Sequence, residues 1–167
     1  MPLQYLAGQP LTADDLQNLA ETRIVQGFDQ SVVSSTTLAD TAIVVPVRDM
    51  TKIELDIRYT SLGGGISWAW AITSGAVTCY NRSITSAGQS PTGNAASISA
   101  MRHRQIATIQ EVQATAHYTT NTSQLILERL VCDGRGEIMF RFAQETSNAN
   151  PTSLYYESYA LYRRLSA

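Results

Sequence analysis

Strict alternation of apolar and polar residues is the feature that most constrains the fold of this chain. Between residues 52 and 59 every second side chain is apolar, and these are Ile53, Leu55, Ile57 and Tyr59. The same period of two returns after three consecutive glycines, in Ile66, Trp68, Trp70 and Ile72. Because successive side chains of a strand point to opposite faces of a sheet, this period predicts a strand with one buried and one wet face over 52–59 and a second strand with a large aromatic face over 66–73.

Further strands are predicted on both sides of this pair. Residues 41–47 alternate as well, and Pro46 places that strand at a sheet edge because proline lacks an N–H. Ser74-Gly75 predicts a turn, and the small polar residues of 81–97 predict a long surface loop. Residues 125–144 predict a hairpin with its turn at Asp133-Gly134. A final long strand is expected over 154–165.

The region from 98 to 118 leaves two alternatives. Its Gln, Glu, Ala, Met and Arg residues suit a helix over 98–116, whereas the Thr-rich segments beside it favour a weak strand over 106–118, which we prefer. At least six strands without a convincing internal helix then predict a mainly β domain. Its expected form is an antiparallel β-sandwich or jelly-roll-like domain.

The N-terminal quarter has a helical pattern instead. The hydroxyl of Thr12 can cap a helix, and Asp15 lies in the first turn, where the helix dipole favours negative charge. Leu11 and Leu16 occupy the two positions of a hydrophobic staple. We therefore predict one helix from Thr12 to Gln26.

Two interpretations of this helix stay open: it packs on its own core, or it docks on another subunit. The polar and β-branched residues 29–40 predict a linker or extended arm with one short strand. The chain is accordingly divided into an N-terminal anchoring segment (1–28), a linker (29–40) and a β-sandwich domain (41–167). The hypothetical anchoring residues are Leu11, Thr12, Asp15, Leu16, Leu19 and Ile24.

Composition excludes several classes of function. The formal net charge is −2, so the chain lacks the basic excess that phosphate-driven nucleic-acid binding requires. The apolar run from Thr41 to Val47 is too short to span a bilayer, and we expect no membrane insertion. The first residues lack the pattern of a secretory signal. Charged residues make up 16% against about 25% in average domains, which suits surfaces that meet other protein.

Residues for catalysis or metal binding are scarce. His103 and His117 are the only histidines, and neither lies near a nucleophile signature such as Gly-x-Ser-x-Gly. Cys79 and Cys132 lack Cys-x-x-Cys spacing, so zinc is not expected. They could pair if their strands are neighbours, although two buried free thiols are the favoured interpretation. We predict no enzymatic activity, no catalytic or metal-binding residues and no cofactor.

Aromatic residues on strands are the one set that could bind a ligand or a subunit. Three interpretations stay open for the tryptophans: core packing, which we favour, a subunit interface, or a glycan site. The last strand carries aromatic residues on both of its faces, which predicts burial on both, by its own sheet or by a neighbouring subunit. The candidate surface residues are Trp68, Trp70, Tyr155, Tyr156, Tyr159 and Tyr162.

Six segments, taken in order, carry a resemblance to a known family. The first has a Leu-Thr-Ala-x-Asp-Leu core and the others match strand motifs; they are Leu11–Leu16, Leu38–Val47, Lys52–Tyr59, Ser67–Trp70, Phe142–Ser147 and Ser158–Leu165. Together they resemble short structural proteins of tailed bacteriophages, especially those that infect actinobacteria. The resemblance covers most of the chain except residues 80–122.

The resemblance implies a non-enzymatic virion structural protein, a minor tail or fibre-like subunit with a β-sandwich, assembled in the host cytoplasm and located in the virion. Its implied partners are its own copies, as a homotrimer, other virion proteins and a host-surface glycan. The chain has no collagen-like repeat, coiled coil or long shaft. A capsid decoration or head-fibre protein, and a receptor- or glycan-binding module, are therefore the alternatives.

Overall fold

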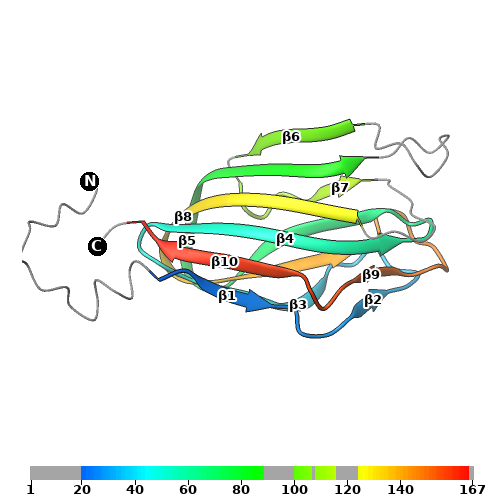
Figure 1. The fold of residues 1–167 in the computed structure, drawn as a ribbon, viewed down its shortest axis with the longest axis horizontal. Helices are drawn as coiled ribbons and strands as arrows, with labels where there is room; N and C mark the ends of the chain where they lie inside the picture. Colours follow the sequence, from blue (N-terminus) through cyan, green and yellow to red (C-terminus); the bar gives the residue numbers. More distant parts are fainter. Residues whose placement is uncertain (1–19, 89–99, 107, 116–123, 166–167) are drawn as a thin grey trace, which may run out of the picture.

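The computed structural model describes residues 20–88, 100–106, 108–115 and 124–165, and every regular element within these ranges is a β-strand (Figure 1). The ten strands are β1 (Thr22–Val25), β2 (Gln30–Val32), β3 (Ala39–Arg48), β4 (Thr51–Ser61), β5 (Ile66–Gly88), β6 (Ala100–Ile106), β7 (Gln113–Thr115), β8 (Gln124–Ala143), β9 (Thr152–Leu154) and β10 (Tyr159–Arg164).

All ten strands belong to one sheet, and every pairing is antiparallel. The main path runs β1-β10-β4-β8-β5-β6, while β3 pairs with β8, β7 with β5, and β9 with both β2 and β4. Figure 1 shows β10, in red, between β1 and β4. The prediction of a mainly β, antiparallel fold is confirmed.

The long strands β5 and β8 form the centre of the sheet. They pair from Ser67 opposite Ala143 to Ser86 opposite Ile126, so almost their full lengths are joined. The other edge of β8 is shared: β3 pairs with its C-terminal half and β4 with its N-terminal half. The strands β3 and β4 therefore follow each other along one edge of β8.

Three glycines, Gly75, Gly134 and Gly136, mark a bend halfway along this centre. Gly75 has φ +68° and Gly134 has φ +125°, so neither is in an extended conformation. A Cβ on Gly75 would lie 2.0 Å from the carbonyl oxygen of Arg135 on the neighbouring strand, which leaves no space for a side chain. Glycine permits both the backbone angle and the close approach.

Beyond the bend the sheet turns back over itself. Trp70 is paired with Phe140, yet its indole N–H donates to the carboxylate of Glu128, twelve residues away along β8. In a straight strand those two positions of β8 would be separated by about 40 Å. The contact shows that the two halves of the bent sheet face each other and share one core.

The core follows the alternation seen in the sequence. In β4 the residues Ile53, Leu55, Ile57 and Tyr59 are at most 2% exposed, as predicted. The opposite half of the sheet contributes Ile43, Val45, Val47, Ile138, Phe140 and Phe142, all fully buried. The ring of Trp70 packs edge-on against Phe140 with centroids 5.6 Å apart. Burial alternates with a period of two in β3 and β4, whereas Ser67 and Ala69, beside the buried tryptophans of β5, are buried as well.

The predicted turns inside the two central strands are wrong. Ser74-Gly75 lies within β5, and Asp133-Gly134 lies within β8, where we expected a hairpin. The expected surface loop 81–97 is also wrong over 81–88, which continues β5, while 89–97 falls outside the described residues. The physical reason is that the two Gly-containing segments pair with each other, so each bends without leaving the ladder.

The predicted helix is wrong in the part that the structure describes. Residues 20–26 contain no helix, and Thr22–Val25 is strand β1, paired with β10. The β-branched residues Thr22, Ile24 and Val25 suit a strand, and the edge of β10 supplies backbone hydrogen-bond partners. The predicted helix start, residues 12–19, lies outside the described residues.

Other expectations divide between confirmed and wrong. The short strand expected in the linker is β2, and β3, which contains Pro46, pairs only with β8 among the described residues. Strands β6 and β7 occupy part of the ambiguous region 98–118, so the helical alternative is wrong in the described part. The prediction of one long final strand is wrong. The segment is divided into β9 and β10 by a turn in which Ser158 N–H donates to Tyr155 C=O.

Candidate functional site

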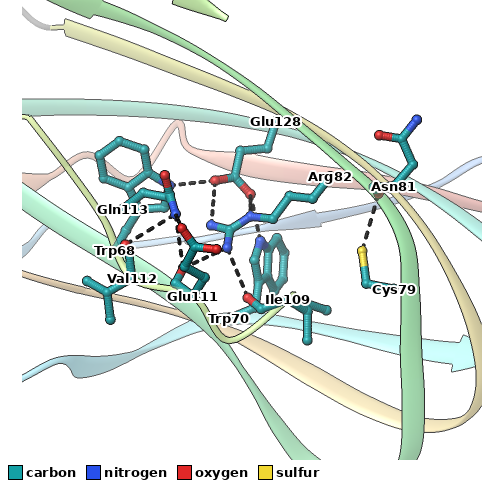
Figure 2. Close-up of polar contacts among 10 residues, drawn as sticks. All are labelled: Trp68, Trp70, Cys79, Asn81, Arg82, Ile109, Glu111, Val112, Gln113 and Glu128. Carbon is teal, nitrogen blue, oxygen red and sulfur yellow. Dashed lines mark hydrogen bonds and ion pairs between the residues drawn. The ribbon is translucent and has the colours of Figure 1, made fainter. Parts of the chain in front are cut away.

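The most organised group of polar side chains is a buried centre around Glu128 in β8. Its carboxylate accepts hydrogen bonds from the indole N–H groups of Trp68, at 2.5 Å, and Trp70, at 2.8 Å. Both tryptophans lie on β5, beyond the bend from Glu128 (Figure 2). The carboxylate therefore joins the two halves of the sheet through the middle of the core.

Arg82 completes this centre from the other half of β5. Its Nη2 lies 2.9 Å from Glu128 Oε1 and its Nε lies 3.3 Å from Oε2, a two-point pairing of guanidinium and carboxylate. Its Nη1 donates to the backbone carbonyls of Ile109 and Glu111, at 3.0 and 2.8 Å. Side chains of both members of the ion pair are 0% exposed. The guanidinium thus fixes the segment before β7 onto the core.

The segment held by Arg82 is also tied from β7. Gln113 donates from its side-chain amide to the backbone carbonyls of Glu111, at 3.4 Å, and Val112, at 3.2 Å (Figure 2). Gln113 itself is 6% exposed. The Glu111 carbonyl thus accepts from both Arg82 and Gln113.

The chemistry of this centre is structural. The carboxylate of Glu128 accepts hydrogen bonds from four N–H groups. The side chains of Glu128 and Arg82 are both fully buried. A buried ion pair of this kind persists only when hydrogen bonds satisfy both members, since desolvation of each charge is unfavourable. We conclude that the centre fixes the relative position of β5, β8 and the 109–111 segment, and that solutes have no access to it.

The aromatic residues singled out from the sequence are not one surface. Trp68 and Trp70 are 1% exposed and belong to the core, which was the favoured interpretation. Tyr159 and Tyr162 are partly buried on β10, where the ring of Tyr159 carries the Arg23 guanidinium at 4.2 Å from its centroid. Of the rest, Tyr155 is partly buried and Tyr156 is 54% exposed.

Most of the predicted anchoring residues fall outside the described part of the chain: these are Leu11, Thr12, Asp15, Leu16 and Leu19. Ile24 is described, and it lies on β1, partly buried against the core. Its position shows that residues 22–25 contribute to the sheet itself.

Three exposed apolar side chains lie at the end of β1 and on the two loops beside it, and of these the sequence predicted a surface role only for Tyr156. Val25, Phe28 and Tyr156, here called the loop patch, are 46%, 54% and 54% exposed. The loops are held together because Gly27 N–H donates to Tyr156 C=O and Tyr156 N–H donates to the carboxylate of Asp29. The separation of these residues in sequence explains why no local pattern revealed the patch.

The two cysteines lie directly opposite each other on the central strands. Cys79 of β5 pairs in register with Cys132 of β8, and both are buried free thiols. The pKa of Cys79 is lowered, chiefly by its hydrogen bond with Cys132, and the same bond together with burial raises the pKa of Cys132. The sequence left this pairing open, since it depended on which strands are neighbours.

Within the described ranges no three His, Cys, Asp or Glu residues are grouped to hold a metal ion. His103 lies on β6, and His117 is outside the described residues. No helix long and apolar enough to cross a membrane occurs in the part of the chain that the structure describes.

No family model matches this chain, and comparisons with curated proteins and with solved structures find no match either.

Proposed function

We propose that this chain is a non-enzymatic structural protein of a bacteriophage virion, a minor tail or fibre-like subunit. The observation that carries the proposal is the coincidence of the phage-like segments with the framework of the sheet. Segments Leu38–Val47, Lys52–Tyr59 and Ser67–Trp70 fall on β3, β4 and β5. Phe142–Ser147 begins at the end of β8, and Ser158–Leu165 covers β10.

Buried polar residues of two of these segments tie loops to one another and a turn to β4. The side chain of Gln144, fully buried, accepts hydrogen bonds from the backbone N–H of Ser35 and Asn148 and donates to the carbonyl of Asn150. The hydroxyl of Ser158, also buried, accepts from the N–H of Arg58 and donates to its carbonyl. Motif residues that hold these parts together support an architectural role.

The finer form of the fold belongs to this proposal. Two halves of one bent sheet that share a core correspond to a β-sandwich, with β3 and the first half of β5 on one side and β4 with β10 on the other. The Trp68 and Trp70 bonds to Glu128 across the core support this form. Such a body suits repeated assembly because its shape is fixed internally before copies meet.

Assembly needs a surface and an anchor, and the sequence supplies the candidate anchor in residues 1–28. The loop patch of Val25, Phe28 and Tyr156 is the candidate for contact between copies, in a homotrimer. Exposed aromatic side chains are enriched at such interfaces. The chain enters the sheet at Thr22, opposite Tyr162, so residues 1–19 join the body at the end where β10 finishes. An anchor there would leave the loop patch, near the other end of β1, free for subunit contact.

The test uses full-length chain with Leu16→Asp and Leu19→Asp, the apolar stripe of the proposed anchor. The matched control, Gln17→Asp with Asn18→Asp, adds the same charge to polar positions in the same segment. The proposal expects the leucine variant to stay folded by circular dichroism and to be lost from purified virions, while the control is incorporated. Normal incorporation of the leucine variant would contradict the anchor.

Subunit contact is tested separately by light scattering. Wild-type protein should form a homo-oligomer at micromolar concentration, and Phe28→Asp with Tyr156→Asp should shift it towards the monomer without loss of the β-sheet spectrum. A monomeric wild-type protein would contradict oligomerisation. Binding of the wild-type protein to a host-cell glycan array would instead favour the receptor-binding alternative.

A further inference from the structure

The opposed cysteines of the central strands are placed as a disulfide requires. Cys79 and Cys132 are register partners in an antiparallel pair. Directly opposite residues of such a pair have Cα atoms about 4.5–5.5 Å apart, within the roughly 4.4–6.8 Å that disulfides span. Both thiols are free. A bond between their sulfur atoms therefore needs rotation of side chains and no movement of either strand.

The two thiols differ in access to solvent. Cys79 is 8% exposed, whereas Cys132 is 0% exposed. The register shifts directly after the pair, between Cys79 and Asn81, and the intervening Tyr80 is 61% exposed. This irregularity interrupts the ladder beside Cys79, so a small molecule meets Cys79 before Cys132.

The two thiols also differ in reactivity. The pKa of Cys79 is lowered, due first to its hydrogen bond with Cys132 and despite the opposing effect of burial, which supports its thiolate form. The raised pKa of Cys132 keeps that sulfur protonated. Because the thiolate is the nucleophile in disulfide exchange, Cys79 is the attacking group and Cys132 the second to react.

We propose that Cys79 and Cys132 form a reversible cross-strand disulfide by exchange with a low-molecular-weight disulfide of the glutathione class. The Cys79 thiolate attacks one sulfur of that disulfide and releases one glutathione thiolate, which leaves a mixed disulfide on Cys79. Cys132 gives up its proton and attacks the Cys79 sulfur, and the second glutathione leaves as a thiolate. Two protein thiols are oxidised and one small disulfide is reduced to two thiols.

The position of the bond gives it a mechanical consequence. It joins β5 to β8 two residues before the bend glycine Gly134 along β8, on the same two strands that carry Arg82 and Glu128. The cross-link would close the chain between residues 79 and 132, the stretch that contains β6 and β7. Oxidation would thus cross-link the two central strands beside the bend, independently of the proposed virion role.

The experiment exposes full-length native protein to oxidised glutathione, then alkylates it under denaturing conditions and measures intact mass. We expect both thiols to become unavailable for alkylation with no glutathione retained, and a melting temperature higher by at least about 5 °C that reverts with reductant. Protein unfolded in urea is the control that the oxidant is active. Two thiols still alkylatable in the native sample, or disulfide-linked dimers, would overturn the proposal.

Single substitutions test the order of attack. In Cys132→Ser the exchange cannot finish, so glutathione should remain attached to Cys79. In Cys79→Ser the buried Cys132 should stay unmodified under the same native conditions. Glutathione on Cys132 in that variant, or none on Cys79 in the first, would contradict Cys79 as the attacking thiol. Because the wild-type mass measurement stands alone, failure of a variant to fold does not remove the test.

Discussion

Replacing Glu128 by Gln should be among the most destabilising single changes that add no volume to this protein. The carboxylate accepts four N–H groups from Trp68, Trp70 and Arg82. A carboxamide removes the charge and turns one acceptor into a donor that faces other donors. The guanidinium of Arg82, 0% exposed, is then an uncompensated buried charge.

The magnitude follows from that burial. Breaking a buried pair by removing one partner destabilises by about 3–5 kcal/mol. The exposed pair Lys52–Glu54, whose side chains are 31% and 37% exposed, supplies a matched control. Glu54→Gln should lower the free energy of unfolding by less than about 1 kcal/mol, because solvent screens an exposed pair.

A double-mutant cycle separates the pair from other effects of substitution. Arg82→Met alone leaves the buried Glu128 carboxylate without its cation. Arg82→Met combined with Glu128→Gln removes both charges. The double variant should be at least about 1 kcal/mol more stable than the sum of the single losses predicts. Equilibrium urea unfolding, at one protein concentration, provides the free energies. Far-ultraviolet circular dichroism is the suitable signal, since Glu128 contacts both tryptophans and would alter their fluorescence.

A free energy of unfolding for Glu128→Gln within about 1 kcal/mol of the wild-type value would contradict a stabilising role of the buried pair. Additive losses in the cycle would show instead that Arg82 and Glu128 act on stability independently.

Two further predictions concern the core tyrosine and the bend. Burial raises the pKa of the Tyr59 hydroxyl in the folded protein. The free energy of unfolding is therefore unaffected below the unfolded-state pKa of about 10, and it falls as the pH rises above that value. Its hydroxyl has no hydrogen-bond partner among the described residues, so Tyr59→Phe should cost nothing at neutral pH and should reduce the loss of melting temperature near pH 11. Gly75→Ala should lower the melting temperature far more than Gly27→Ala, because both have positive φ but only Gly75 faces a backbone oxygen 2.0 Å from the added Cβ; equal losses in thermal melts would contradict a backbone clash.

Period-two patterns predicted the elements that face a core on one side only. The buried set of β4 follows from Ile53, Leu55, Ile57 and Tyr59 alone, because nothing but a half-buried strand places these residues on one face. The edge position of Pro46 likewise follows from a missing N–H. Both are local properties, independent of which strand is the neighbour.

Glycine was misleading where its role depended on pairing. Asp133-Gly134 has the composition of a hairpin turn, and only the opposite strand, with Gly75 at its own bend, allows β8 to continue. The same dependence separates β1 from a helix: the hydrogen-bonding edge of β10 that stabilises β1 comes from residues more than a hundred positions later. Local propensity cannot include a partner so distant in sequence.

The buried centre did leave a signal in the sequence. Glu128 stands between Ile126 and Leu130 on an apolar face, and Arg82 precedes Ile84 in the same phase. A single charge in an apolar row of each of two strands is the pattern expected of a buried pair. Its pairing with the tryptophans could not be predicted, because it depends on the bend that brings distant parts of β5 and β8 together.

If the chain is a virion subunit, as proposed, quantitative mass spectrometry of purified particles of the bacteriophage concerned tests that role most directly. A structural subunit should be present in many copies per particle, in a number divisible by three, and should remain with the particles through gradient purification. If the chain is instead recovered in the soluble lysate and is absent from intact particles, the virion role is contradicted.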